Sequence, residues 1–341
     1  MIDLAQQAQN SGLTPVNNEK KHSSLRARTI TSAVYVTVWV IMVVMKWCIP
    51  HGNVNGGWGA LGFDAVFCAV SVIGAFEFLR AIENGKGMGL RISTPQRSVT
   101  IAFCAVAVPL YVLVEVVPET TGAGFLAVAV AFTIYTMLLA ATSVFDHNRS
   151  SVKGTISCIF CMLYCGVLAV MLSSINHLGT NSMAAILMLF MGSVLSDTGA
   201  FLLGSTLKKY VPLKLAPQLS PNKTVIGAVG GLLGGIAGGV LAFYVMYLLG
   251  GINDEIFLVR FNEVFLSVKS PTFPPLLSFI LIGLCTSVMS QIGDLFESAI
   301  KRECGVKDMG NLLPGHGGVL DRFDSMLYCS VLVLFSFGTI F

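Results

Sequence analysis

The stretch VIGAVGGLLGGIAGGVLAFYVMYLL, residues 225–249, contains 25 consecutive residues and no charged side chain. About 20 apolar residues in an α-helix are enough to cross the hydrocarbon core of a bilayer. Lipid offers no partner to an unpaired backbone group, so such a stretch crosses the membrane as a helix. The whole chain has the same character, because 54% of its 341 residues are apolar and only 11% are charged. The sequence therefore predicts an all-α, polytopic membrane protein.

Further apolar stretches of similar length divide the chain into membrane spans and polar connections. Nine spans are predicted, at residues 30–49, 60–79, 98–117, 124–144, 154–175, 182–203, 225–249, 275–298 and 324–341. Residues 1–28 form a polar tail and residues 29–181 hold the N-terminal spans. Residues 182–341 form the C-terminal region, with two polar connections at 204–224 and 299–323.

The distribution of positive charge predicts the orientation of the spans. Eighteen of the 21 lysines and arginines either precede span one or follow an even-numbered span. Only Lys46, Arg260 and Lys269 lie elsewhere. Cytoplasmic connections of membrane proteins carry an excess of Lys and Arg. We therefore expect a cytoplasmic N-terminus, and we place the two polar connections of the C-terminal region together on the cytoplasmic face.

Carboxylates inside or beside the spans are candidates for a functional site, because charge within lipid is costly. Asp197 lies near the end of span six, and Asp294 and Glu297 lie in the last turns of span eight. All three approach the face that carries the basic connections. Three others lie close to span ends and are interpreted as interfacial or loop-facing carboxylates: Asp64, Glu77 and Glu115.

Helical spacing relates the residues at the end of span eight. Asp294, Ser298 and Lys301 are separated by four and three positions, so they share one face of the helix. Glu297 precedes Lys301 by four positions, which favours an ion pair between these two side chains. This helix end therefore carries both acidic and basic groups toward the cytoplasmic face.

The connection before span nine ends in LPGHGGVLDRFDS, residues 313–325, where charge and glycine alternate in an otherwise apolar chain. Asp321 and Asp324 are three residues apart and would project together from a helix. Clustered carboxylates repel unless a cation lies between them, and Mg²⁺ takes one or two carboxylates together with substrate phosphates. Carboxylates beside lysines and arginines favour phosphoryl or nucleotidyl transfer. A solvated loop would explain the basic residues but not the interleaved carboxylates, histidine and glycines.

These residues resemble the signature of the phosphatidate cytidylyltransferases, also called CDP-diacylglycerol synthases. The signature positions are Ser298-Ala-Ile-Lys301-Arg302, Val306-Lys307-Asp308, Leu313-Pro-Gly-His-Gly-Gly318 and Asp321-Arg322-Phe-Asp324. A second block matches at Ser196-Asp-Thr-Gly-Ala-Phe201, Lys214-Leu-Ala-Pro217, Ser220-Pro221 and Lys223-Thr224. The resemblance extends over residues 192–326, and the earlier spans agree with the family only in their hydrophobic character.

The resemblance implies an enzyme that joins CTP to phosphatidate in the cytoplasmic leaflet and releases pyrophosphate, leaving CDP-diacylglycerol in the membrane. It implies Mg²⁺ as cofactor, leaves a second, monovalent cation open, and implies a homodimer without any role for nucleic acid. The compact chain favours a bacterial inner membrane. The implied catalytic residues are Asp294 and Asp321, as metal ligands, with Lys301, Lys307, Asp308 and Asp324. The implied substrate contacts are Asp197, Lys214, Ser220, Pro221, Lys223, Thr224, Ser298, Arg302, His316, Gly317 and Arg322.

Three positions in the second block depart from the usual pattern of that family. Asn222 and Ser205 stand where the family often has a basic residue, and Ile226 stands where it commonly has a glutamate. We therefore expect fewer charged substrate contacts from residues 204–227, with the metal-binding signature intact.

Small residues on two of the spans predict close packing. Within residues 227–239, glycine recurs at every fourth position along two adjacent ridges, formed by Gly227, Gly231, Gly235 and Gly239 and by Gly230, Gly234 and Gly238. Such ridges let another helix approach closely, so we expect packing against the site helices or between subunits.

Cys158, Cys161 and Cys165 share one helix face and are interpreted as small packing residues rather than metal ligands.

Two other functions remain open. A different CTP-using membrane enzyme, similar to a polyprenol kinase, would use the same metal chemistry with another lipid acceptor. An ion-coupled transporter would use Asp197 and Asp294 to bind its ion. Transporter sites usually lie near the midplane between internal repeats, whereas the acidic residues here gather at one face.

Overall fold

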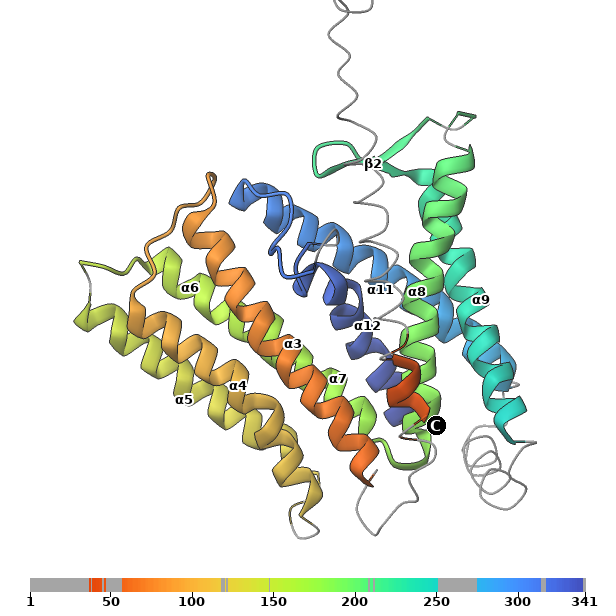
Figure 1. Ribbon diagram of the computed structural model, residues 1–341, viewed down its shortest axis with the longest axis horizontal. Coiled ribbons are helices and arrows are strands. Elements are labelled where there is room, and N and C mark those ends of the chain that lie inside the picture. Colours follow the sequence, from red (N-terminus) through yellow and green to blue (C-terminus); the bar gives the residue numbers. More distant parts are fainter. Residues whose placement is uncertain are drawn as a thin grey trace, which may run out of the picture.

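The protein is built almost entirely from long helices arranged side by side (Figure 1). The computed structural model describes residues 37, 39–44, 46, 57–117, 120, 122–146, 148–207, 209–210, 212–250, 275–313 and 317–339. Within these ranges, seven helices are long and apolar enough to cross a membrane. The predicted all-α, polytopic architecture is therefore confirmed. Of predicted span one, residues 30–49, the structure describes only residues 37, 39–44 and 46, so the count of nine spans and the orientation of the N-terminus stay predictions.

The N-terminal helices form at the predicted apolar stretches. They are α3 (Gly57–Asn84), α4 (Thr94–Val116) and α5 (Gly124–Phe145), followed by α6 (Val152–Cys161), the π-helix η2 (Met162–Val167), α7 (Leu168–Asn176) and the 3-10 turn η3 (Gly179–Asn181). The start of α4 is set by a capping box. The Ser93 side chain accepts the Gln96 N–H, and the Gln96 side chain accepts the Ser93 N–H. These two bonds satisfy backbone donors that have no partner inside the helix.

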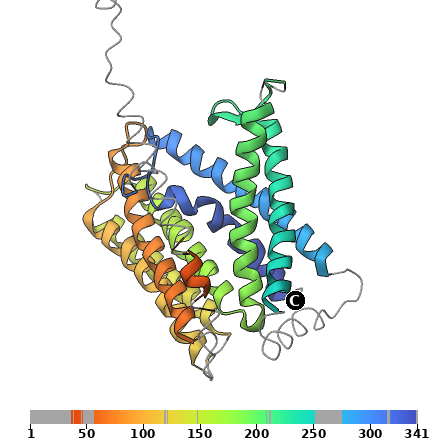
Figure 2. The same cartoon turned by 45° about the vertical axis from the view of Figure 1, so that its right-hand side comes forward.

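The C-terminal region adds four helices and a short hairpin. These elements are α8 (Ser182–Leu207), β1 (Lys214–Ala216), β2 (Ser220–Thr224), α9 (Val225–Gly250), α11 (Pro275–Cys304) and α12 (Leu320–Thr339). The predicted polar connection 204–224 thus contains an antiparallel pair of strands, which the sequence did not indicate, with Lys214 opposite Thr224. The hairpin lies beyond the ends of α8 and α9 (Figure 2). Helix α12 has charged residues in its first turns and is not one of the seven apolar helices.

The hydrophobic core is one continuous cluster that joins the N-terminal helices to the C-terminal ones. It extends from Trp39 and Met42, which precede α3 in the chain, to Phe337 on α12. Cys158, Cys161 and Cys165 are all buried in this cluster, which supports their interpretation as packing residues.

Asp64 is buried, which corrects its interpretation as an interfacial or loop-facing carboxylate. Its side chain accepts a hydrogen bond from Ser173 Oγ at 2.6 Å and lies 2.9 Å from His177 Nε2. Only 5% of Asp64 is exposed. The carboxylate therefore joins α3 to the end of α7 inside the protein, because a buried charge requires polar partners.

Glycine allows α9 to touch both of its neighbours with its backbone. Cβ atoms added at Gly230, Gly234 or Gly238 would lie well inside 3.0 Å of carbonyl oxygens of α8. Cβ atoms at Gly235 or Gly239 would collide in the same way with carbonyl oxygens of α11. Both ridges are therefore used within this chain, and the predicted packing against the site helices is confirmed.

We expect Gly234→Ala to destabilise the protein, because the new methyl group would meet the Leu195 carbonyl oxygen. Overpacking of this kind typically costs about 1–3 kcal/mol. Gly62→Ala is the matched control, since an added Cβ there meets nothing within 4 Å. The measurement is the Tm of each purified variant in the same detergent. Equal Tm values for the two variants would contradict the account.

Candidate active site

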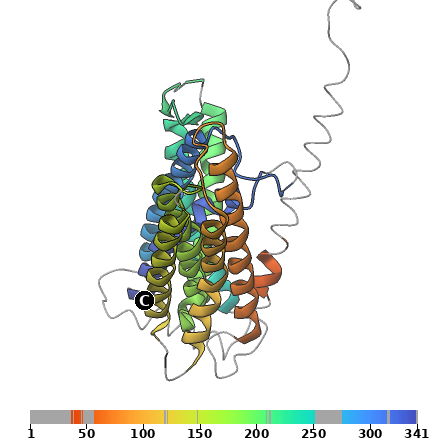
Figure 3. The same cartoon turned by 90° about the vertical axis from the view of Figure 1, so that its left-hand side faces the viewer.

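The connections that carry the predicted cytoplasmic charge meet at one end of the helices. Arg302 Nε at the end of α11 donates to the Leu219 carbonyl of the hairpin at 3.1 Å. The Gly87 N–H, in the connection after α3, donates to the Cys304 carbonyl at 3.1 Å. The hairpin and the end of α3 also lie toward the same end of the molecule in Figure 3. The predicted grouping of these connections on one face therefore agrees with the structure.

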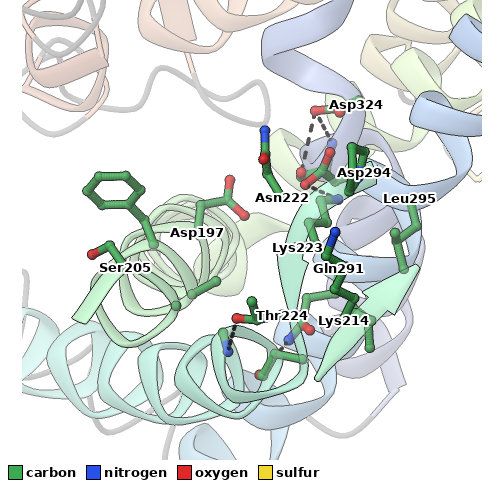
Figure 4. A pocket seen from close by; sticks show the side chains of 18 of the residues that line it. Asp197, Ser205, Lys214, Asn222, Lys223, Thr224, Gln291, Asp294, Leu295 and Asp324 are labelled. Atoms are coloured by element: carbon green, nitrogen blue, oxygen red, sulfur yellow. Dashed lines mark hydrogen bonds and ion pairs between the residues drawn. The ribbon is translucent and has the colours of Figure 1, made fainter. Parts of the chain in front are cut away.

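A cavity of about 840 Å³ lies between the hairpin and the adjoining parts of α8, α9, α11 and α12. Most of the predicted site residues line it. These are the carboxylates Asp197, Asp294, Asp321 and Asp324, the basic residues Lys214, Lys223, Lys301 and Arg322, and the hairpin residues Pro221 and Thr224. Figure 4 shows Asp197 on one side of the cavity, with Asp294 and Lys223 on the other. One cavity is thus lined by acidic and basic groups from five elements.

Other predicted site residues lie outside the lining of this cavity. Lys307 and Asp308 are exposed on the loop after α11, and Ser298 is buried. Ser220 is half-buried at the start of β2, and Arg302 is exposed beside the hairpin. Their proposed contacts with substrate stay predictions.

The glycine turn of the signature is described only in part. Gly317 has a φ of 86°, a left-handed conformation that favours glycine. An added Cβ there would lie 2.8 Å from Asp321 Oδ2. His316 lies outside the described residues, so its role also stays a prediction.

Lys223 of the hairpin forms an ion pair with Asp294 of α11. The distance from Lys223 Nζ to Asp294 Oδ2 is 2.5 Å, and the two side chains are 25% and 38% exposed. Asp197 of α8, on the other side of the cavity, accepts a hydrogen bond from Ser290 Oγ of α11 at 3.3 Å. A partly exposed ion pair contributes little to stability. The pair is therefore suited to exchange its partners when a ligand enters.

Lys301 lies between two carboxylates that are more deeply buried than itself. It forms ion pairs with Glu297, one helical turn away, and with Asp321 of α12, at 3.0 Å. The Glu297 side chain is fully buried, and that of Asp321 is 3% exposed. The predicted Glu297–Lys301 pair is therefore confirmed, and Lys301 also joins the end of α11 to the start of α12.

Asp321 organises the loop that precedes it. Its Oδ2 accepts the backbone N–H of Gly318 at 2.7 Å and that of Met309 at 3.0 Å, while Oδ1 accepts Lys301 Nζ at 3.0 Å. Burial alone raises the pKa of this carboxyl, but Lys301 and the two N–H groups lower it to a net value below its usual range. Asp321 is therefore ionised, with donors already on both oxygens.

The carboxylates of the cavity could hold Mg²⁺ only if substrate phosphates supplied the remaining oxygen ligands. Among the described residues, no three or more His, Cys, Asp or Glu side chains form a ready-made metal site. Mg²⁺ needs only one or two carboxylates when substrate phosphates complete its shell. Asp294 is partly exposed and would have to give up Lys223, and Asp321 would have to exchange one of its present donors. The predicted pair of ligands is chemically suitable on this condition.

Gln291 of α11 lines the cavity and was missed from the sequence. Its Nε2 donates to the Ala228 carbonyl of α9 at 3.2 Å. A neutral residue within an apolar helix gave no charge signal, and only its place one turn before Asp294 could have indicated it. Asn222 and Ser205, which depart from the family pattern, also line the cavity. They supply amide and hydroxyl groups where a basic residue is common.

The model of the cytidylyltransferase family matches residues 26–341. A phosphatidate cytidylyltransferase of Staphylococcus saprophyticus is 33% identical over 191 residues, which cover 56% of this chain and 62% of that protein. One from Bacillus subtilis is 39% identical over 140 residues, covering 41% of this chain and 42% of that protein. The matched region thus spans less than two thirds of either relative.

We expect Lys301→Met to destabilise the protein strongly, because it leaves Glu297 and Asp321 without their shared cation. Removal of one partner from a buried ion pair typically costs about 3–5 kcal/mol. Lys307→Met is the matched control, since Lys307 is exposed on the next loop. The Tm of both variants in detergent measures the difference. A Tm for Lys301→Met equal to that of the control would show that this cation is not required for stability.

Proposed function

The chain belongs to the cytidylyltransferase family, and on this premise we propose that it transfers the cytidylyl group of CTP to phosphatidate. The products are CDP-diacylglycerol and pyrophosphate. The observation that carries the proposal is the cavity that four carboxylates and four basic side chains line together. Both substrates are anions that repel one another, and a site for two anions needs cations close to their phosphates.

Phosphatidate supplies its own nucleophile in this reaction. An oxygen of its phosphate attacks the α-phosphorus of CTP, and the bond from that phosphorus to the pyrophosphate oxygen breaks. A phosphate monoester is largely ionised at neutral pH, with a second pKa of about 6. No strong general base is therefore needed, and the site has mainly to position two phosphates and stabilise charge.

Four basic residues are placed to hold these phosphates. Lys214 and Lys223 come from the hairpin, Lys301 from α11 and Arg322 from α12. A phosphate that binds Lys223 would take this lysine from Asp294 and so free the carboxylate. In the same way, a phosphate that binds Lys301 would free one oxygen of Asp321. The ion pairs of the site thus allow phosphate binding to prepare the carboxylates.

The freed carboxylates of Asp294 and Asp321 are our candidates for Mg²⁺ ligands. When bound, Mg²⁺ neutralises charge on the reacting phosphates and on the departing pyrophosphate. Lys301 is the donor that Asp321 can exchange, because its other donors are backbone N–H groups of a folded loop. The second, monovalent cation stays a prediction without a defined set of ligands.

The position of the cavity suits a reaction between a soluble and a lipid substrate. The cavity lies at the end of the helices where the basic connections meet, and we place this end in the cytoplasm. CTP would enter from water and phosphatidate from the adjacent leaflet of a bacterial inner membrane. The expected homodimer needs a surface other than the glycine ridges of α9, because these ridges contact α8 and α11.

The proposal is tested with purified protein in lipid nanodiscs, Mg²⁺ and CTP, labelled in the cytosine ring for the phosphatidate reaction and at the γ-phosphorus for the polyprenol reaction. We expect labelled CDP-diacylglycerol when phosphatidate is present. With polyprenol as the lipid, we expect no phosphorylated product. No CDP-lipid with Mg²⁺, Mn²⁺ or Co²⁺ would contradict the proposal, and formation of polyprenyl phosphate would favour the kinase-like alternative.

We expect Asp294→Asn to lower kcat by about 100-fold or more, because a neutral amide is a poor magnesium ligand. The Tm should change little, since the Lys223 pair is partly exposed. Glu303→Gln is the control, because Glu303 is exposed at the end of the same helix. The measurements are the initial rate of CDP-diacylglycerol formation and the Tm. Full activity of Asp294→Asn would remove Asp294 from the proposed ligands.

A further inference from the structure

Glu77 of α3 holds the loop before α12 from the other half of the chain. Its Oε1 accepts the backbone N–H of Val319 at 3.0 Å, and its Oε2 accepts that of Leu320 at 2.9 Å. Only 8% of Glu77 is exposed. The two bonds join positions more than 240 residues apart in the sequence. A carboxylate from a span with no resemblance to the signature thus touches the signature itself.

The loop is shaped around this carboxylate by two glycines. An added Cβ at Gly310 would lie well inside 3.0 Å of Glu77 Oε1, and one at Gly318 would lie equally close to Oε2. Real Cβ atoms essentially never approach another atom this closely. Any larger residue at either position would push the carboxylate away. The Glu77 side chain therefore occupies a slot that only glycine leaves open.

The bonded N–H groups lie at the start of α12, where they have no partner inside the helix. This end of a helix also carries partial positive charge, which favours an anion. Gly318 donates to Asp321, and the next two residues, Val319 and Leu320, donate to Glu77. Three consecutive backbone N–H groups are thus bound by the two carboxylates Asp321 and Glu77. The start of α12 is fixed by Asp321 from its own first turn and by Glu77 from α3.

We propose that Glu77 is a positioning residue for the transfer reaction, an inference that rests on the function proposed above. It fixes the first turn of α12 and therefore the direction in which Asp321 and Asp324 face the cavity. Glu77 does not line the cavity, so it acts through these residues rather than on the substrate. The N-terminal spans thus contribute to the geometry of the site as well as to the membrane anchor.

The first test compares Glu77→Gln with Glu83→Gln, a control on the same helix whose carboxylate pairs with Arg97. Glutamine has one acceptor oxygen, so its NH₂ group would face one of the two N–H donors. We expect Glu77→Gln to lower kcat about tenfold or more, because small misplacements of catalytic groups are costly. The KM for CTP and the Tm should change little, and the control should keep the wild-type kcat. If Glu77→Gln fails to fold, Glu77→Asp replaces it in the comparison with Glu83→Gln. Aspartate keeps the negative charge, but its shorter side chain does not reach both N–H groups.

The second test asks whether Glu77 and its slot act together. Gly310→Ala alone should lower kcat, because its methyl group would displace the carboxylate. In a Glu77→Ala background the methyl group has room, so the same substitution should cost much less. Such a departure from additivity is the expected sign of direct coupling. Simple multiplication of the two losses in kcat would overturn the inference.

Hydrogen exchange separates this inference from the proposed function. We expect faster amide exchange at Val319 and Leu320 in Glu77→Gln than in the wild type or in Glu83→Gln. Wild-type exchange and wild-type kcat in Glu77→Gln would overturn the positioning role. A wild-type protein that makes no CDP-lipid would overturn the proposed function instead. In that case the exchange rates would still decide whether Glu77 holds the start of α12.

Discussion

Backbone contact between α9 and its two neighbours sets the geometry on which the site depends. At Gly230, Gly234 and Gly238 the backbone of α9 directly contacts that of α8, and at Gly235 and Gly239 it contacts that of α11. The two outer helices consequently meet, and Ser196 Oγ of α8 lies 2.8 Å from Ser287 Oγ of α11. Asp197 and Asp294 lie further along these helices, on opposite sides of one cavity. The hairpin that connects α8 to α9 then lies over this cavity and brings Lys223 to Asp294.

The site is also constrained by the cost of charge beside lipid. Lys223 is paired with Asp294, and Lys301 lies between Glu297 and Asp321. These two lysines are therefore already paired with carboxylates. Phosphates and a divalent cation would enter by exchange, with phosphate taking the lysine and the metal taking the carboxylate. Such a site favours ligands that bring both kinds of charge, as a nucleotide with its magnesium ion does.

The helical fold could be predicted from the sequence, because apolar length is a local signal. Charge and the family resemblance together indicated the acidic and basic residues that line the cavity. The charge distribution grouped the connections correctly, and the spacing of Glu297 and Lys301 predicted their ion pair. The hairpin could not be predicted in this way, since its two short, polar strands show no alternation of apolar and polar residues. The role of Glu77 could not be predicted from the sequence either. Its partners are backbone N–H groups in a distant loop, and nothing in the sequence of α3 indicates them.

Asp321 shows the limit of a motif as a guide to chemistry. The resemblance implied a metal ligand, and the structure adds that both of its oxygens accept hydrogen bonds from the loop or from Lys301. The motif identifies Asp321 as a candidate ligand. Its hydrogen bonds show that Lys301 or a backbone N–H group must move away before Asp321 can bind a metal ion. The signature therefore contributes residues to the cavity, and through Asp321 it also holds its own loop.

The central claim is that the cavity transfers the cytidylyl group of CTP and leaves pyrophosphate behind. The most direct measurement follows the two ends of the triphosphate, with CTP labelled at the α-phosphorus in one reaction and at the γ-phosphorus in another. With phosphatidate as the acceptor, the account predicts that the α label enters the lipid fraction while the γ label appears as pyrophosphate. Recovery of the γ label in the lipid, with the α label left in CDP, would contradict the account.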